Sequence, residues 1–238
     1  MPMMKPRILF LAGLVANLVL TLVCVGIGQR GGVEYLMRKS GLRKVQPNVY
    51  ETDHIIHYFK RVPVGPSDTV IVADSILGSC PTGLYFRGTK NFGIGGIRTE
   101  DVLETVDWLA EQKPSRAVVA LGLNDLFNAM PSENSLANFR RIIRAFHRHD
   151  TTRIVVLSVL PFNYSIAVNA VDISTKIQEF NRELEECCRQ EGVRYIDLTA
   201  DFIDKHGRLK ADYTFDGYHL NYEGQFRLME ALARKEAL

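Results

Sequence analysis

The sequence has little of the features that commit a chain to a specialised class of protein. Only four of its 238 residues are cysteine, the formal net charge is +2, and acidic and basic residues are interspersed. Because no strongly basic segment is present, a nucleic-acid partner is not expected. The sequence also lacks internal repeats and low-complexity tracts, and its content of 46% hydrophobic, 24% charged and 9% aromatic residues is ordinary. This length and composition predict one sizeable globular domain with a short appendage.

The cysteines are not spaced as a disulfide framework or a metal site. Cys24 lies in a hydrophobic segment, Cys80 stands alone, and Cys187 and Cys188 are adjacent. Adjacent cysteines rarely form a disulfide with each other, and no CxxC pair is present. We expect the cysteines to act as small apolar residues, which leaves the redox compartment undecided.

One long hydrophobic run lies near the N-terminus. Residues 8–28 contain no charged side chain, and Lys5 and Arg7 precede them. A helix of about 20 apolar residues can span a bilayer, whereas a cleaved signal usually has a shorter run of about 7–15 residues and a small-x-small cleavage site. The only loose match to such a site is Gly26-Ile27-Gly28. We predict that residues 1–29 are an uncleaved single-pass membrane anchor; a cleaved signal, which would release a secreted protein, and a buried soluble helix are the alternatives.

The charges that flank this run give conflicting indications of orientation. The segment after the run is the more basic one, and by the positive-inside rule it would keep the large domain in the cytoplasm. A short basic N-terminus followed at once by an apolar run is, however, how exported chains begin. We favour an extracytoplasmic domain.

The rest of the chain alternates between strand-like and helix-like segments. We divide it into a connector with a first helix at 30–67 and a main domain at 68–238. This alternation implies an α/β fold with a mostly parallel sheet covered on both faces, in which ligands bind at the carboxyl ends of the strands. The expected strands are 69–73, 89–92, 117–121, 153–160 and 193–198, and the expected helices are 52–61, 99–112, 134–149, 173–191 and 222–237.

Four polar clusters follow the predicted strands. They read ADSIL at 73–77, NFGIGG at 91–96, GLND at 122–125 and DGYHLNYEG at 216–224. Taken singly, a serine after a strand is more often a helix cap, and glycine or Asn-Asp pairs are commonly turn residues. Taken together, they supply one nucleophile, one acid–base pair and two further groups of hydrogen-bond donors at one edge of the sheet.

The order of these motifs, with SVLP between the last two, resembles the SGNH/GDSL hydrolase family, most closely the branch of bacterial acylhydrolases similar to platelet-activating-factor acetylhydrolase subunits. The resemblance extends over roughly residues 50–236. It implies a three-layer αβα fold with a five-stranded, flavodoxin-like sheet. It also implies a nucleophilic Ser75, a general base at His219 and an orienting acid at Asp216.

The same resemblance assigns an oxyanion hole to the backbone N–H groups of Ser75 and Gly96 and the side-chain amide of Asn124. Gly95 is the alternative to Gly96. The chain departs from the family pattern twice: Ala73 stands where glycine is usual, and Ile97 stands where an aspartate is usual. Neither change removes a predicted catalytic group, so activity is expected to survive.

The chemistry is consistent with this assignment. A serine hydroxyl is a poor nucleophile until an adjacent imidazole accepts its proton, and an acid three residues before the histidine can fix the imidazole tautomer. Such hydrolysis needs neither a metal nor another cofactor. Arg98, Asn163 and Tyr164 follow predicted strands closely enough to be candidate substrate contacts.

The predicted function is that of a serine esterase that removes a small acyl group, an acetyl group above all, from a carbohydrate or a lipid. An acyltransferase acting on an envelope glycan with the same triad is the first alternative, and an inactive binding module is the second. The sequence does not indicate an oligomeric state.

Overall fold

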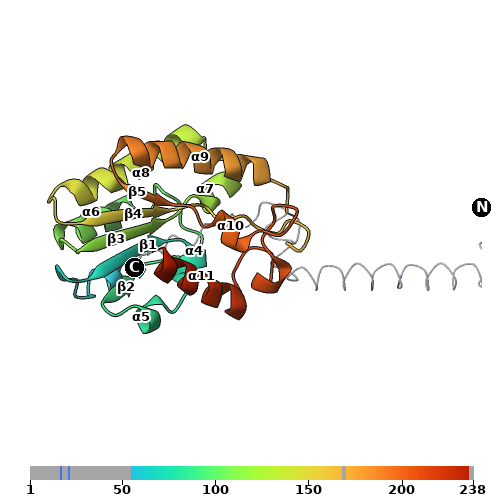
Figure 1. The fold of residues 1–238 in the computed structure, drawn as a ribbon, viewed down its shortest axis with the longest axis horizontal. Coiled ribbons are helices and arrows are strands. Elements are labelled where there is room, and N and C mark those ends of the chain that lie inside the picture. The colour runs from blue at the N-terminus through green and yellow to red at the C-terminus, as the bar shows by residue number, and fades with distance from the viewer. Residues whose placement is uncertain (1–16, 18–20, 22–54, 168–169, 236–238) are drawn as a thin grey trace, which may run out of the picture. The chain divides into compact units, whose positions relative to one another are not determined.

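Five parallel strands form the centre of the protein (Figure 1). The computed structural model describes residues 17, 21, 55–167 and 170–235. The strands lie in the order β2-β1-β3-β4-β5, and every pairing is parallel, so the predicted five-stranded parallel sheet is confirmed. Their bounds are β1 Thr69–Ala73, β2 Thr89–Asn91, β3 Arg116–Ala120, β4 Arg153–Leu157 and β5 Arg194–Ile196.

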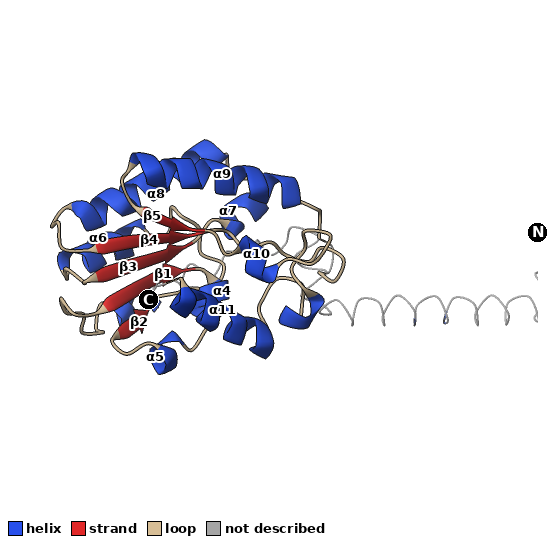
Figure 2. Ribbon diagram, viewed as in Figure 1, coloured by secondary structure: helices blue, strands red, loops and turns tan. Residues whose placement is uncertain are grey.

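Helices cover both faces of the sheet, which gives the three αβα layers (Figure 2). One face carries α6 (Leu103–Glu111), α8 (Ser132–His147) and α9 (Ser174–Gln190), which contact one another in that order. The opposite face carries α11 (Tyr222–Arg234). Short helices fill the connections: α4 (Ser75–Gly78), α5 (Thr82–Tyr85), α7 (Leu123–Phe127), α10 (Thr199–Phe202) and the 3₁₀ turn η1 (Ala211–Tyr213).

The core forms where apolar strands meet apolar helix faces. The central strands β1, β3 and β4 are uninterrupted apolar runs after their first residue, as expected for strands buried on both faces. On α8, Phe139, Ile142, Ile143 and Phe146 recur at helical spacing and are fully buried. The predicted amphipathic helix at 134–149 is therefore confirmed, with its ends shifted by two residues. Cys80, Cys187 and Cys188 are buried and free, as expected, whereas Cys24 lies outside the described residues.

The strand order places a topological switch point between β1 and β3. The chain leaves β1 for β2 on one side and returns to β3 on the other, and ligands bind at such crevices in open α/β sheets. The residues that follow β1 and β3 therefore share the edge of the sheet where a site is expected.

Two predicted boundaries were wrong for identifiable reasons. The predicted strand 153–160 ends at Leu157: the Ser158 N–H still donates to the Ile196 carbonyl at 3.0 Å, but the next N–H on that side, that of Leu198, donates to the Ser158 hydroxyl at 2.9 Å and not to a backbone carbonyl. The predicted helix 99–112 begins at Leu103, because the N–H and hydroxyl of Thr99 are bound by the buried Asp125.

The predicted membrane anchor at 1–29 lies, except for Asn17 and Thr21, outside the described residues. Within the part of the chain that is described, no helix is both long enough and apolar enough to cross a membrane. Most of the predicted connector at 30–67 also lies outside, although helical residues 55–59 match the end of the helix predicted at 52–61.

Candidate active site

Ser75 is fixed at the first turn after β1. The strand ends at Ala73, Asp74 caps α4, and Ser75 is the first helical residue. The Asp74 carboxylate accepts a hydrogen bond from the Ile76 N–H at 3.0 Å, and the Asp74 N–H donates to the Ala120 carbonyl at the end of β3. The nucleophile predicted from the sequence is therefore held by the sheet on one side and by its own helix cap on the other.

A continuous hydrogen-bonded chain joins Ser75 to His219 and Asp216. The Ser75 Oγ lies 3.0 Å from His219 Nε2, and His219 Nδ1 lies 2.6 Å from Asp216 Oδ2. The other carboxylate oxygen of Asp216 accepts the backbone N–H groups of Tyr218 and His219 at 2.8 and 2.7 Å. Burial raises the pKa of the Asp216 carboxyl, but the hydrogen bonds from the His219 ring and from these two N–H groups outweigh burial, so the pKa lies below its ordinary value of 3.8. Asp216 is therefore ionised at neutral pH and can hold the proton of His219 on Nδ1, which leaves Nε2 to accept the serine proton.

The loop that carries the acid and the base is closed by its own hydrogen bonds. The Thr214 hydroxyl donates to the His219 carbonyl at 2.8 Å and accepts the Gly217 N–H at 2.9 Å. The Gly217 carbonyl in turn accepts the Asn163 N–H at 2.7 Å. Gly217 has φ +89°, and a Cβ there would lie 2.7 Å from the Asn163 carbonyl oxygen and the Ala167 nitrogen. Only glycine allows this turn to lie so close to its neighbour.

Phe215 covers one face of the imidazole. Its ring is stacked on that of His219 with centroids 5.9 Å apart and an angle of 13°, yet 68% of Phe215 is exposed to solvent. His219 therefore lies at the protein surface beneath an aromatic ring. Sequence reasoning missed both Phe215 and Thr214, and the only signal for them was their position just before Asp216.

Gly95, the alternative oxyanion donor, lies beside Ser75. A Cβ built on Gly95 would lie 3.9 Å from the Ser75 Cβ, and Gly96 has φ +74° with no atom within 4 Å of a Cβ. In the described part of the chain, the N–H groups of Ser75, Gly95 and Gly96 donate to no protein acceptor. The Asn124 side chain, on α7, uses one N–H on the Ile97 carbonyl at 3.0 Å, which leaves its second N–H for a ligand.

The two departures from the family pattern are accommodated. Ala73 is buried at the end of β1, where it is aligned with Ala120 of β3. The Ile97 side chain is buried in the core, and its carbonyl is the group that anchors Asn124. Two residues later, the Thr99 N–H donates to the Asp125 carboxylate at 3.1 Å.

Arg98 is not a free cation. Its guanidinium makes two hydrogen bonds to Asp101, both at 3.0 Å, and lies 2.8 Å from Glu100. The hydrogen bonds from Arg98 to Asp101 raise the pKa of the guanidinium above its usual range. A substrate anion would have to compete with these carboxylates, so the structure does not favour the predicted substrate contact.

Asn163 is a correction to the sequence prediction. It is 2% exposed, its side-chain N–H donates to the Leu209 carbonyl at 2.8 Å, and its side-chain oxygen accepts the hydroxyl of Ser165 at 2.5 Å. Its polar atoms are thus used to hold the loop that supports Gly217, and it is not placed to contact a substrate. Tyr164 is half-buried, and the Arg208 guanidinium lies 5.9 Å from its ring centre.

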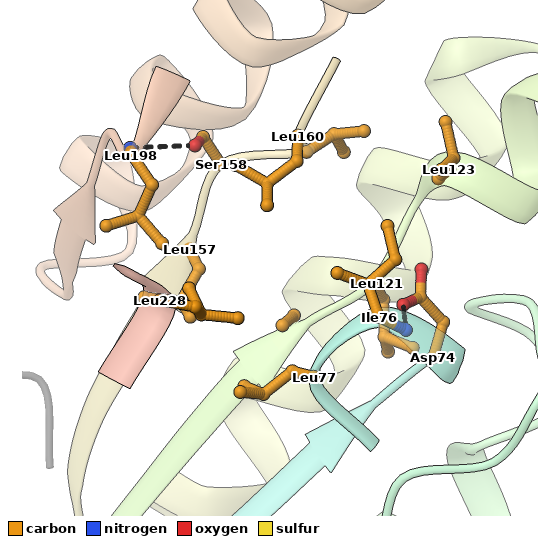
Figure 3. A pocket seen from close by; sticks show the side chains of 12 residues that line it. Asp74, Ile76, Leu77, Leu121, Leu123, Leu157, Ser158, Leu160, Leu198 and Leu228 are labelled. Atoms are coloured by element: carbon orange, nitrogen blue, oxygen red, sulfur yellow. Dashed lines mark hydrogen bonds between the residues drawn. The ribbon is translucent and has the colours of Figure 1, made fainter. Parts of the chain in front are cut away.

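A small cavity of about 30 Å³ lies on the inner side of the nucleophile turn (Figure 3). Asp74 and Ser158 contribute its polar groups, and leucines such as Leu121, Leu157 and Leu198 contribute much of the rest. Burial in this apolar setting raises the pKa of Asp74 to about 6; the Ile76 N–H and the nearby His219 lower it, and Asp125 raises it further. Ser75 does not line the cavity, which has room for about one water molecule and is too small for a substrate.

No group of three or more His, Cys, Asp or Glu side chains among the described residues is arranged to hold a metal ion.

Comparison with known proteins agrees with the fold. A model of the GDSL-like Lipase/Acylhydrolase family matches residues 80–226, a range that contains Asn124, Asp216 and His219 and begins just after Ser75. A Streptococcus pneumonia protein provisionally described as a platelet activating factor is 27% identical, with a TM-score of 0.71 over 79% of this chain and 93% of that chain. A GDSL-like lipase from Bacteroides thetaiotaomicron shares the fold at 18% identity, with a TM-score of 0.66 over 79% of this chain and 98% of that one.

Among curated proteins, the N-acylneuraminate cytidylyltransferase of Streptococcus agalactiae serotype V is 26% identical over 191 residues, which cover 80% of this chain and 43% of the relative. This chain thus spans less than half the length of the curated relatives that it matches. The family match, in contrast, extends over more than half of the chain. The chain therefore belongs to the GDSL-like lipase/acylhydrolase family of carboxylic ester hydrolases.

Proposed function

We propose that this protein is a serine esterase that works through an acyl-enzyme on Ser75. The observation that carries the proposal is the hydrogen-bonded chain from Ser75 through His219 to Asp216. His219 takes the hydroxyl proton as Ser75 attacks the ester carbonyl, and then gives that proton to the leaving alcohol. Water attacks the acyl-enzyme next, with His219 again taking the proton, and the carboxylic acid leaves as the serine hydroxyl is restored.

The negative charge on the carbonyl oxygen is held by N–H groups that donate to no protein acceptor. We assign this role to the N–H groups of Ser75 and Gly96, with Gly95 as the neighbouring alternative, and to the Asn124 amide. Such donors stabilise the tetrahedral intermediate because they are already oriented when the charge develops, and losing one typically lowers the rate by about 100–1000-fold.

We further propose that the substrate is a short acyl ester, such as an acetyl ester, of a carbohydrate or a lipid. The support is that the site lies at the surface, where Phe215 presents an exposed aromatic ring beside His219 for the alcohol part of the substrate to contact. The curated relatives are named for an N-acylated sugar acid, which makes acetylated forms of such sugars a reasonable part of any substrate screen. A chain-length series of p-nitrophenyl esters together with acetylated sugars would identify the preferred acyl and alcohol groups.

Replacement of Ser75 by alanine tests the assignment. We expect S75A to lose p-nitrophenyl acetate hydrolysis by on the order of 10⁴-fold or more and to lose labelling by a fluorophosphonate probe. Ser79 offers a matched control, because it is an exposed serine at the C-terminal end of the same helix, and its hydroxyl donates only to the Ile76 carbonyl. S79A should retain both activities, and unchanged turnover by S75A would end the assignment.

Hydrolysis and acyl transfer share the same acyl-enzyme, so the products must be measured. When a glycan acceptor is added with the acyl donor, we expect free acid to exceed acylated glycan. The opposite ratio would reassign the protein as an acyltransferase.

We also propose that the run at 8–28 anchors the protein in a membrane with the esterase domain on the extracytoplasmic side. The support is the length of the uncharged run and the short basic segment before it. Extraction of membranes with alkaline carbonate should leave the full-length chain in the pellet, and external protease should degrade the domain in intact cells. Release by carbonate would argue against the anchor, and protection from protease would reverse the orientation.

A further inference from the structure

Asp125 is a fully buried carboxylate for which the proposed reaction gives no role. It follows Asn124 on α7 and is 0% exposed. Its oxygens accept the Thr99 N–H at 3.1 Å, the Thr99 hydroxyl at 2.5 Å and the Ser135 hydroxyl at 3.0 Å. A buried carboxylate is costly unless such donors satisfy it, so its presence between two segments of the candidate site needs an explanation.

These contacts join the two segments that carry the remote oxyanion donors. Thr99 lies three residues after Gly96, and Asp125 lies one residue after Asn124. A second bridge between the same segments is the hydrogen bond from the Asn124 amide to the Ile97 carbonyl at 3.0 Å. The loop after β2 and the helix after β3 are thus joined at two points.

The network also includes Ser135 and Asn138, which lie on α8, outside both donor segments. The Asn138 side chain, on α8, donates to the Thr99 hydroxyl at 3.1 Å, so that hydroxyl donates to one group and accepts from another. Thr99 and Ser135 are both 0% exposed. Neither hydroxyl can exchange its partner for solvent, so the position of Thr99 relative to Asp125 is fixed.

We propose that Asp125 is a positioning residue that sets the distance between the Gly96 loop and the Asn124 amide, so that both donors reach one carbonyl oxygen. The inference rests on the proposed function, because it assumes that these groups form the oxyanion hole. Such donors act at about 2.7–3.1 Å from the oxygen, and a misplacement of about 1 Å can cost on the order of 100-fold in rate. The Ile94 N–H ties the start of the loop to the Ala73 carbonyl of β1 at 3.0 Å, and the Thr99–Asp125 pair ties its other end to α7.

The test compares two hydroxyls that bind the same carboxylate. Thr99→Val removes the hydroxyl on the donor loop, and Ser135→Ala removes the hydroxyl on α8, which bears no oxyanion donor. We expect T99V to lower kcat for p-nitrophenyl acetate by about 10–100-fold with KM within about 3-fold of the wild type, because only the charged intermediate loses stabilisation. S135A should lower the melting temperature but leave kcat within about 3-fold, and Thr99→Ser, which keeps the hydroxyl, should restore kcat.

Equal losses of kcat in T99V and S135A, or no loss in either, would overturn the proposal and leave Asp125 as a structural residue. If T99V does not fold, Asn138→Ala replaces it as the test. Asn138 is half-buried, and its removal takes away the hydrogen bond that it donates to the Thr99 hydroxyl. This variant should lower kcat several-fold, and an unchanged kcat would count against the inference. The S75A and Asn124→Ala variants separate this result from the proposed function. Loss of activity in both, with full activity in T99V, would refute the role of Asp125 alone.

Discussion

Replacing Asp74 by asparagine should stabilise the protein at neutral pH and much less in mild acid. Burial raises the pKa of Asp74 from 3.8 to about 6. Between those values the folded protein binds a proton that the unfolded chain does not, so stability falls as the pH rises from about 4 to about 6. Above pH 6 the carboxylate is ionised in both states, and its burial then costs about 3 kcal/mol; at pH 4.5 the cost is about 1 kcal/mol.

Asparagine retains the side-chain oxygen that caps Ile76, and it is as good a helix cap as aspartate. Urea unfolding of the wild type and D74N at pH 7.5 and 4.5 should therefore give a stability difference that is larger by about 2 kcal/mol at the higher pH. Asp197 provides the control, because its exposed carboxylate accepts the Thr199 N–H at 2.8 Å in the same local geometry. D197N should change stability little at either pH. A D74N effect independent of pH, or a loss of stability at pH 7.5, would refute the reasoning.

Three further predictions concern the loop behind the triad and the core. Gly217→Ala should lower kcat by on the order of 100-fold, because its Cβ would lie 2.7 Å from two backbone atoms, whereas Gly207→Ala, at φ +74° with open space around it, should keep full activity. Asn163→Ala should lower the free energy of unfolding, measured with urea, by roughly 1–3 kcal/mol, because it leaves the Leu209 carbonyl unpaired. It should leave KM unchanged, and a raised KM would support the substrate contact predicted from the sequence. Phe139→Ala should lower the free energy of unfolding by about 3–5 kcal/mol in the same assay, because the ring is fully buried on α8. It should retain kcat at low temperature, because Phe139 is far in sequence from the triad.

The parts of the fold that could be predicted are those with enough residues to show a pattern. The β-branched run of β1 and the apolar period of α8 each depend on four or more buried positions in one segment. Helices of four or five residues, such as α4, α5 and α7, complete little more than one turn and show no such period. For that reason none of the three could be given bounds from the sequence, although one of them carries Ser75.

The candidate site divides in the same way between local and distant contacts. Asp216 and His219 are three residues apart, so their pairing follows from a single turn. The parallel sheet explains why the residues after β1 and β3 meet. Nothing near Asn163, in contrast, indicates that its amide binds Leu209, which lies 46 residues away. The sequence likewise does not indicate that Thr99 binds Asp125, 26 residues away, and because of this contact α6 begins later than predicted.

These two kinds of contact imply different sensitivities to substitution. The acid and the base share one loop, so a change that shifts this loop as a unit moves Asp216 and His219 together and preserves their 2.6 Å contact. What such a change disturbs is the 3.0 Å contact between His219 and Ser75, which joins residues 144 apart in the chain. Substitutions around Gly217 should therefore act on both proton transfers by His219, from the serine and to the leaving alcohol. Substitutions around Asp125 should act on the oxyanion and leave those transfers intact. Activity toward esters with leaving groups of different basicity distinguishes the two, because only impaired proton transfer to the leaving alcohol is relieved by a leaving group, such as p-nitrophenolate, that needs no proton.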